Sequence, residues 1–523
     1  GSFLEAAGGT LSLGGSALVA EAGEGRTAEV VTSGPLVRLD GTVVLGGQAA
    51  PLVQLRGGSL TSSAGLLDLH ATTLDLGAQA VLELTGGGAA TAAGPAVTLA
   101  GDTLLADALA VSDGSGRLRL SGPLLDLTDA GAQLRTLAEP GALELTLGAG
   151  VPRVRLVRST LGLTGEGEAL VVMGGPEGGV DAGVALVATG AAGAPSEIFL
   201  SGPLLRLAAV DATATDPLVQ LDFTKVTNGI GSAPLVLVDP AGGDVSLHGP
   251  LLRGTTFGGL DVGAALVAFR DGRLRSATAS PLVDLAGVEV TAAGALADLA
   301  GPAPFALTLG GPLLRSAGGG LALEGGLLRI AGGSFLEVPG DPGAAVLALS
   351  GGAHVLGGAK GVVVDLAGPA EAVAPEVVEG VALSLGTHRP VSGVGGTAVA
   401  APLVELADGA VAVAGGIARL DTALYEATAP LLALRAATLV AEARGVDLAA
   451  RAKLASVGPV VRLDGATLLV RNGALVAVVG GSLLRVTGDL VDLRNGSVLT
   501  LANGAVLSVT GASVTTISGA LAA

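Results

Sequence analysis

The stretch 34–41 reads Gly-Pro-Leu-Val-Arg-Leu-Asp-Gly, and the stretch 458–465 reads Gly-Pro-Val-Val-Arg-Leu-Asp-Gly. Between them the chain repeats a motif that opens on Pro-Leu-Val or Pro-Leu-Leu, and successive openings are separated by nearly whole multiples of 15 or 16 residues. These openings are Pro35, Pro51, Pro123, Pro203, Pro217, Pro234, Pro250, Pro281, Pro312, Pro402 and Pro430. A fixed period over the whole chain predicts one small structural unit stacked many times, which is a solenoid.

Within one repeat, apolar and polar residues alternate after the proline. In residues 50–65, for example, Val53 and Leu55 flank the polar Gln54. A period of two with one polar side predicts a short strand that buries one face and exposes the other. The polar slot between the two apolar residues is filled by Arg38, Gln54, Asp68, Glu83, Asp126, Arg206, Gln220, Asp284, Glu405 and Arg462.

Sharp corners are expected between these strands. Asp-Gly, Gly-Gly or Ala-Gly follows many of them, and glycine supplies the positive φ that such a corner needs. The four asparagines, Asn228, Asn472, Asn495 and Asn503, also each precede a glycine. Because proline has no amide hydrogen to donate to a sheet, we expect it at the first position of each strand.

The predicted fold class is therefore all-β, a single-stranded parallel β-helix (β-solenoid) with a repeat unit of about 15 residues. A full turn takes either about 15 or about 30 residues, and proline spacings such as that between Pro250 and Pro281 favour the longer turn. No shift in composition marks a boundary, so residues 1–523 are expected to form one continuous domain. The less regular stretches are predicted to be loop insertions or degenerate repeats, with a binding ridge as the alternative; they are 139–152, 174–196, 369–400 and 436–457.

Composition excludes several other classes of protein. The 87 glycines among 523 residues argue against long helices, and no apolar run is long enough for a membrane-spanning helix. Cysteine is absent, so no disulfide or thiolate metal site is expected. A formal net charge of −18 makes nucleic acid and anionic membranes unexpected partners.

No residue pattern predicts catalysis or a cofactor, so the chain is not expected to be an enzyme. The four histidines, His70, His248, His354 and His388, are far apart in the sequence and are interpreted as outward strand or corner residues. Outward acids such as Asp68, Asp126 and Asp284 could stack as the paired carboxylates of a polysaccharide-processing enzyme, but a solvated charged face is the preferred interpretation. Calcium at Asp239 or Asp341 is the one weak metal hypothesis, and 495–497 matches a glycosylation sequon.

The two ends of the sequence continue the repeat. Residues 1–5, Gly-Ser-Phe-Leu-Glu, recur as 333–337, and the repeat pattern still holds close to Ala523. Solenoids normally carry a polar or helical cap at each end, and no such segment is recognisable here. The pattern leads to the expectation that copies stack head to tail into a filament; the alternative is that the chain is a piece of a longer solenoid.

The tandem Pro-Leu-Val-x-Leu units, the Gly, Ala, Leu, Val and Thr bias and the absence of cysteine resemble bacterial filamentous-haemagglutinin-like and autotransporter-passenger proteins. This resemblance implies a right-handed β-helix on or outside a bacterial cell. The function expected first is a structural protein that forms extracellular fibres or a surface layer. An adhesin stalk that binds a surface or glycan is the alternative, and a polysaccharide-processing enzyme is a distant third.

Overall fold

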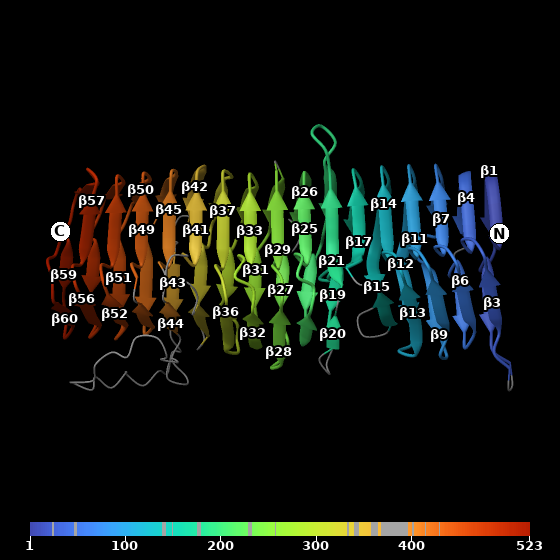
Figure 1. The fold of residues 1–523 in the computed structure, drawn as a ribbon, viewed down its shortest axis with the longest axis horizontal. Helices are drawn as coiled ribbons and strands as arrows, with labels where there is room; N and C mark the ends of the chain where they lie inside the picture. Colours follow the sequence, from blue (N-terminus) through green and yellow to red (C-terminus); the bar gives the residue numbers. More distant parts are fainter. Residues whose placement is uncertain are drawn as a thin grey trace. The chain divides into compact units, whose positions relative to one another are not determined.

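Strands are the regular elements of this chain. The computed structural model describes residues 1–23, 26–46, 50–138, 143–148, 150–174, 179–181, 183–228, 233–256, 258–331, 334–338, 345–356, 364–367, 396–399, 402–413, 415–427 and 429–523. Over these ranges the chain contains short strands joined by turns and bends, and no helix. Parallel strands stack into a β-solenoid of about 14 turns, which confirms the predicted fold class (Figure 1). The right-handed winding stays a prediction.

Contacts between residues divide the chain into two units, although its composition shows no boundary. The first unit comprises Gly1–Gly175, Asp181–Arg206 and Asp216–Ala233. The second comprises Pro176–Val180, Leu207–Thr215 and Pro234–Ala523. Each unit is built from ladders of parallel strands, in which a strand pairs with its equivalent one turn further along the chain.

One turn of the second unit contains four strands. The first ladder comprises β29 (Leu252–Thr255), β33 (Val283–Ala286), β37 (Leu314–Ala317), β41 (Leu347–Ser350), β45 (Val404–Ala407), β49 (Leu432–Arg435), β53 (Val461–Asp464) and β57 (Val491–Arg494). The second comprises β30 (Gly259–Val262), β34 (Glu289–Ala292), β38 (Leu321–Leu323), β42 (Ala353–Leu356), β46 (Ala410–Val413), β50 (Thr438–Ala441), β54 (Thr467–Val470) and β58 (Val498–Leu501). The third comprises β27 (Val236–Val238), β31 (Val267–Phe269), β35 (Ala297–Leu299), β39 (Leu328–Ile330), β43 (Val364–Ala367), β47 (Ala418–Asp421), β51 (Val446–Ala449), β55 (Val476–Val478) and β59 (Leu507–Val509). The fourth comprises β24 (Val210–Ala212), β28 (Asp244–Leu247), β32 (Gly272–Ser276), β36 (Phe305–Leu309), β40 (Phe335–Val338), β44 (Gly396–Val399), β48 (Leu424–Ala427), β52 (Lys453–Val457), β56 (Leu483–Thr487) and β60 (Val514–Ile517).

The first unit has the same four ladders. The first comprises β1 (Leu4–Leu13), β4 (Val37–Gly46), β7 (Leu67–His70), β11 (Val97–Ala100), β14 (Leu125–Thr128), β17 (Pro152–Val157), β21 (Val184–Thr189) and β25 (Val219–Asp222). The second uses the later parts of β1 and β4, then β8 (Thr73–Asp75), β12 (Thr103–Ser112), β15 (Gly131–Ala138), β18 (Thr160–Leu163), β22 (Ser196–Phe199) and β26 (Thr224–Asn228). The third comprises β2 (Leu18–Glu21), β5 (Val53–Arg56), β9 (Ala80–Thr85) and the later part of β12; the fourth comprises β3 (Glu29–Thr32), β6 (Ser59–Ser62), β10 (Ala89–Ala92), β13 (Gly116–Leu120) and β16 (Leu143–Leu147). Three more strands fall where the sequence passes between the units: β19 (Val171–Met173), β20 (Gly179–Asp181) and β23 (Leu205–Leu207).

Register settles the length of a turn. Val37 pairs with Leu67, Leu252 with Val283 and Val461 with Val491, so the equivalent position returns after about 30 residues. The repeat of about 15 residues is half a turn, because Pro35 precedes a strand of the first ladder and Pro51 precedes a strand of the third. The longer of the two expected turns is therefore confirmed, and the shorter one is wrong.

The prolines lie slightly earlier than expected. Pro35 is followed by one bend residue, Leu36, and the strand begins only at Val37. In this position the proline carbonyl still accepts a hydrogen bond from the preceding turn, as when the Leu282 amide donates to Pro312. Leu36 and Val37 are both buried because the chain bends between them. The missing proline amide therefore removes no bond from the ladder.

The core consists of aliphatic side chains stacked in columns along each ladder. Val37 and Leu39 are 1 % exposed, and their partners one turn on, Leu67 and Leu69, are equally enclosed. Aromatic residues are rare in this interior: Phe269 and Phe305 pack together with ring centroids 5.3 Å apart and ring planes tilted by 49°. Burying such columns turn after turn is the main source of stability in a solenoid, because each turn covers the next.

The stretches expected as loop insertions contain regular strands, and in one of them residues 190–195 form a short loop closed by an antiparallel bridge between Ala191 and Ala194. Strand β16 lies within 139–152 and pairs with β13, and β21 lies within 174–196 and pairs with β17. The stretch 436–457 holds β50, β51 and β52, so the chain follows the normal turn there. The repeat motif is not recognisable in this stretch because Arg444-Gly445, rather than Pro-Leu, precedes β51. Most of 369–400 lies outside the described residues, apart from β44.

Candidate functional site: strand faces and terminal turns

Outward positions of one ladder form columns of charge in which acids meet arginines. In the first unit, register places Arg38 beside Asp68, and Asp126 beside Arg155. In the second unit, Asp284 lies between Arg253 and Arg315. In-register stacking brings equivalent side chains to about 4.8 Å spacing, where like charges would repel, so alternation of sign is the stable arrangement.

The three acids considered as stacked carboxylates lie beside guanidinium groups. Arg155 Nε donates to Asp126 Oδ1 at 2.8 Å, and its Nη2 donates to the other carboxylate oxygen. Arg315 makes the same two-pronged contact with Asp284 at 2.8 and 2.7 Å. These hydrogen bonds hold the pKa of both guanidiniums above the usual arginine value. Asp68 and Asp126 share a ladder but are separated by Thr98, so neither faces a second carboxylate there.

The histidines do not cluster in the described part of the chain. His70 Nε2 lies 2.9 Å from Asp68, and His248 Nε2 lies 3.0 Å from Asp211. His354 was expected to face outward, but it is buried at 2 % exposure and its Nε2 contacts the Gly351 carbonyl at 3.0 Å. Burial lowers the pKa of His354. His388 lies outside the described residues.

The described residues contain no obvious metal-binding centre. No three side chains of the His, Asp or Glu type come together within those ranges to hold an ion. Asp239, one of the two calcium candidates, is half-buried beside β27, and Asp341 is outside the described residues. Asn495, the sequon asparagine, sits in a left-handed corner at φ 52°, with its side-chain amide donating to Asp464.

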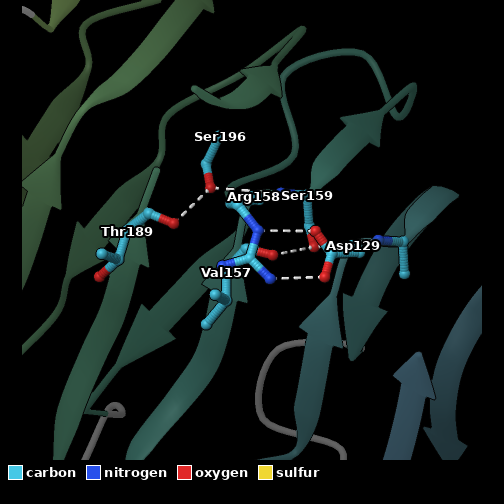
Figure 2. A network of polar contacts seen from close by, with 7 residues as sticks. Asp129, Val157, Arg158, Ser159, Thr189 and Ser196 are labelled. Atoms are coloured by element: carbon cyan, nitrogen blue, oxygen red, sulfur yellow. Dashed lines mark hydrogen bonds and ion pairs between the residues drawn. The ribbon is translucent and has the colours of Figure 1, made fainter. Parts of the chain in front are cut away.

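A polar network stabilises the corner between the first and second ladders of the first unit (Figure 2). Arg158 occupies the left-handed region at φ 49° and donates to Asp129 through Nε (2.7 Å) and Nη2 (2.6 Å). Ser159 follows it, is 2 % exposed and donates to the Val157 carbonyl at 2.8 Å. The Ser159 amide in turn donates to Ser196 Oγ at 3.3 Å, which links this corner to the next turn. The bond from Arg158 lowers the pKa of Asp129.

The sequence does not reveal this corner through glycine, the residue that usually marks a positive φ. Residues other than glycine adopt positive φ at the same place in several turns, including Ala71, Phe223, Thr256 and Ala436. The available signal is the next residue, which in the first unit is often a hydroxyl or carboxyl side chain that is buried, such as Thr42, Thr72, Asp102 and Thr224.

The first and last turns leave core positions half-covered. Leu4 and Leu11 face inward but are only half-buried, whereas their register partners Val37 and Val44 are 1 % and 0 % exposed. At the other end Ile517 is half-buried and pairs with Val486, which is 1 % exposed. Phe3, Val498 and Val514 add large exposed apolar side chains, at 56 %, 49 % and 56 %. Each of these turns therefore presents an apolar strand edge on one side.

Comparison with known proteins adds no relative: no protein-family model matches the chain, and no curated protein matches it significantly. Among the residues that the structure describes, no helix is long and apolar enough to cross a membrane. What can be said of the chain rests on its own geometry.

Proposed function

We propose that this chain is a structural repeat protein whose copies associate end to end into a filament, fibre or surface layer. The observation that carries the proposal is the pair of half-covered strand edges. Leu4 and Leu11 lack the cover that the described inner turns give their neighbours, and Ile517 lacks it on the opposite side. Covering such side chains contributes about 25 cal/mol for each Å² of apolar surface removed from water.

The two edges are complementary because all turns share one plan. The first turn supplies a strand edge to each of the four ladders through β1, β2 and β3, and the last turn does so through β57, β58, β59 and β60, so the last turn of one copy can pair with the first turn of another. A contact between two different surfaces of the same molecule does not close on itself, and it generates an open polymer. Unpaired strand edges are the usual templates for such growth.

An extracellular position on a bacterial surface is the setting that we propose for this polymer. Its support is the repeat style shared with filamentous-haemagglutinin-like and autotransporter-passenger proteins, together with the absence of cysteine. The proposal assigns no catalysis to the chain. Its acids Asp126 and Asp284 are buried beneath Arg155 and Arg315, which fits a stabilising column of ion pairs.

The experiment blocks each edge separately with a lysine. Leu11→Lys places a charge on the inward side of the first turn, and Ile517→Lys places one on the inward side of the last turn. The matched controls are Thr10→Lys and Thr516→Lys, which change the neighbouring outward residues. We expect polymers of the unmodified chain and of both controls in electron micrographs. Each inward variant alone stays monomeric, and an equimolar mixture of the two stops at dimers, because one functional edge of each kind remains.

Sedimentation velocity of the same samples measures the size distribution. Monomeric unmodified chain at high concentration would sink the proposal. Polymers that persist in the mixture of the two blocked variants would also contradict it, because they would show growth through some other surface.

A further inference from the structure

A groove with a volume of about 650 Å³ lies on the outward face of the second ladder in the first unit. Its centre is a register column across four neighbouring strands, formed by Gln133 of β15, Gly162 of β18, Phe199 of β22 and Thr227 of β26. Binding sites for small ligands commonly have volumes of about 300–1,000 Å³, so this groove is large enough for one.

The groove exists because Gly162 carries no side chain. Leu161 and Leu163 are buried on either side of it, so position 162 faces outward. A Cβ at this position would meet Gln133 Cγ at 3.5 Å, an ordinary contact, and the backbone has no positive φ that requires glycine. Glycine weakens a strand, so its presence in β18 is not explained by the fold. It leaves a gap between Gln133 and Phe199, which are two strand spacings, or roughly 10 Å, apart.

Phe199 forms one wall of this gap with its ring in solvent. Its exposure is 42 %, whereas Phe269, Phe305 and Tyr425 are at most 1 % exposed. Phe199 belongs to an inner turn of the first unit, paired on one side with Gly162 and on the other with Thr227, so an open end does not explain its exposure. An aromatic side chain held in this way offers a flat apolar face that gains free energy when a ligand covers it.

Polar groups line other parts of the groove. Gln133 and Glu166 are both exposed, and neither has a hydrogen-bond or ion-pair partner among the described residues. Glu166 is positioned by a tight loop in which Gly165 donates to the Arg135 carbonyl at 3.1 Å. A Cβ on Gly165 would lie 2.3 Å from that carbonyl oxygen, so the loop needs glycine there and is closely fitted. A carboxylate and an amide with free hydrogen-bonding capacity therefore line the same groove as the aromatic face.

We infer that this groove binds a neutral saccharide. The C–H face of a sugar ring is apolar and flat and matches Phe199, while its hydroxyls donate to the Glu166 carboxylate and exchange hydrogen bonds with the Gln133 amide. No lysine or arginine lines the groove, so an anionic ligand has no counter-charge there. The groove carries polar groups at its rim and an apolar ring at its wall, the combination that selects a polyhydroxylated ligand over a purely apolar one.

The test uses the complete 523-residue chain on a printed array of neutral oligosaccharides, followed by calorimetric titration with the sugar that binds best. Phe199→Ala removes the stacking face, and Gly162→Val fills the gap with a residue suited to a strand. We expect each variant to weaken binding by about tenfold or more, equal to about 1.4 kcal/mol. The Gly162→Val protein should unfold at the same or higher temperature, which separates a blocked site from a damaged fold. Phe3→Ala, which removes the other strongly exposed phenylalanine of the first unit, is the control and should bind sugar normally.

Three results would overturn the inference. The array shows no binding by the unmodified chain; or binding survives both Phe199→Ala and Gly162→Val; or Phe199→Ala abolishes self-association in the absence of sugar, which would identify the groove as a contact between copies. The result is independent of end-to-end assembly, because the Leu11→Lys protein, blocked at its first turn, should bind the sugar with unchanged affinity.

Discussion

The corner between the first and second ladders has the same left-handed backbone conformation in both units. The residue that follows the left-handed position differs between them. In the first unit Ala71 (φ 49°) and Arg158 (φ 49°) take the left-handed conformation, and in the second unit Ala436 (φ 47°) and Gly318 (φ 71°) do so. The residue that follows is polar in much of the first unit, such as Asp102 or Ser159, and small in the second, such as Gly319 or Ala437.

In the first unit, side chains satisfy the corner amides. Asp102 is 4 % exposed, and its carboxylate accepts hydrogen bonds from the Thr72 amide one turn earlier and from the Ala100 amide at 2.7 Å. Ser159 Oγ accepts from the Ala130 amide at 3.2 Å in the same manner. A buried amide without an acceptor would cost about 1–3 kcal/mol, so these side chains stabilise the stack.

In the middle turns of the second unit, close approach of the backbone takes the place of these side chains; near its last turn Ser497 Oγ again accepts from the Ala466 amide at 3.2 Å. A Cβ on Gly319 would lie 2.1 Å from the Val288 oxygen, and one on Gly352 would lie 2.0 Å from the Gly319 oxygen. The turns that contain Val288, Gly319 and Gly352 therefore approach each other at this corner only because glycine has no side chain there. A solenoid can therefore keep one corner conformation with either a hydrogen-bonding side chain or none, but the two solutions are not interchangeable.

The largest effect is expected from placing a methyl group in the second kind of corner. Gly352→Ala combines a clash with the Gly319 oxygen and a strained φ of +75°, and should cost about 3–5 kcal/mol of the free energy of unfolding. Gly496→Ala is the control, since its φ of +72° is similar but its Cβ would meet nothing within 4 Å. It should cost only about 1–2 kcal/mol. Equal losses in urea unfolding followed by circular dichroism would show that close approach is not what requires glycine at 352.

Removing the carboxylate from the first kind of corner comes next. Asp102→Asn keeps the shape but sets an amide N–H against one of the two backbone donors, which should cost about 1–3 kcal/mol at neutral pH. Hydrogen exchange at the Thr72 and Ala100 amides should rise with it. An unchanged unfolding midpoint would show that the carboxylate does not support the corner.

Asp102 also gives the comparison a pH dependence. Burial raises the pKa of its carboxyl and outweighs the hydrogen bonds from Thr72 and Ala100. The folded protein then holds this proton more tightly than the unfolded chain, so protonation of Asp102 stabilises the fold. This part of the stability is full below the ordinary aspartate pKa and is lost as pH rises through the folded pKa. Asp102→Asn removes this titrating group. The change in the free energy of unfolding between pH 3 and pH 7 should therefore differ between the variant and the unmodified chain by the Asp102 contribution. A profile identical to that of the unmodified chain would contradict the assignment.

A smaller loss is expected at Ser159. Ser159→Ala leaves the Ala130 amide without its acceptor and should cost about 1–2 kcal/mol. The reverse exchange in the second unit, Ala437→Ser, buries a hydroxyl where the corner is built without one, and should not raise stability by the amount that Ser159→Ala loses. If the two substitutions shifted the unfolding midpoint by equal and opposite amounts, the two corners would be equivalent after all.

The smallest effect concerns the backbone that both corners share. Ala71→Gly and Ala436→Gly each relieve a left-handed alanine at nearly the same φ, and should raise stability by less than about 1 kcal/mol, because the greater freedom of glycine in the unfolded chain offsets part of the gain. The two gains should agree when measured by urea unfolding. A gain in one unit and a loss in the other would show that the corner backbone differs between them.

Much of the fold was predictable from local pattern. The alternation around Gln54 and the recurring Pro-Leu openings predicted parallel stacked strands, and spacings such as Pro250 to Pro281 favoured the turn that the register of Leu252 and Val283 confirms. The stretch 436–457 was wrongly expected to be a loop because its strands lack the proline opening. The left-handed Arg158 and Phe223 could not be foreseen, since their local sequence favours other conformations and the neighbouring turns impose this one.

The period of apolar residues alone determined that this protein is a solenoid, because side chains that alternate along a strand must bury one face and equal units bury it best against each other. Only the tertiary structure decided which turns meet which. It placed Arg315 against Asp284, Asp102 beneath the Thr72 amide, and the gap at Gly162 beside Phe199. These partners are about 30 residues apart or more, and their contacts depend on register and on the closeness of neighbouring backbones, which a local pattern does not specify.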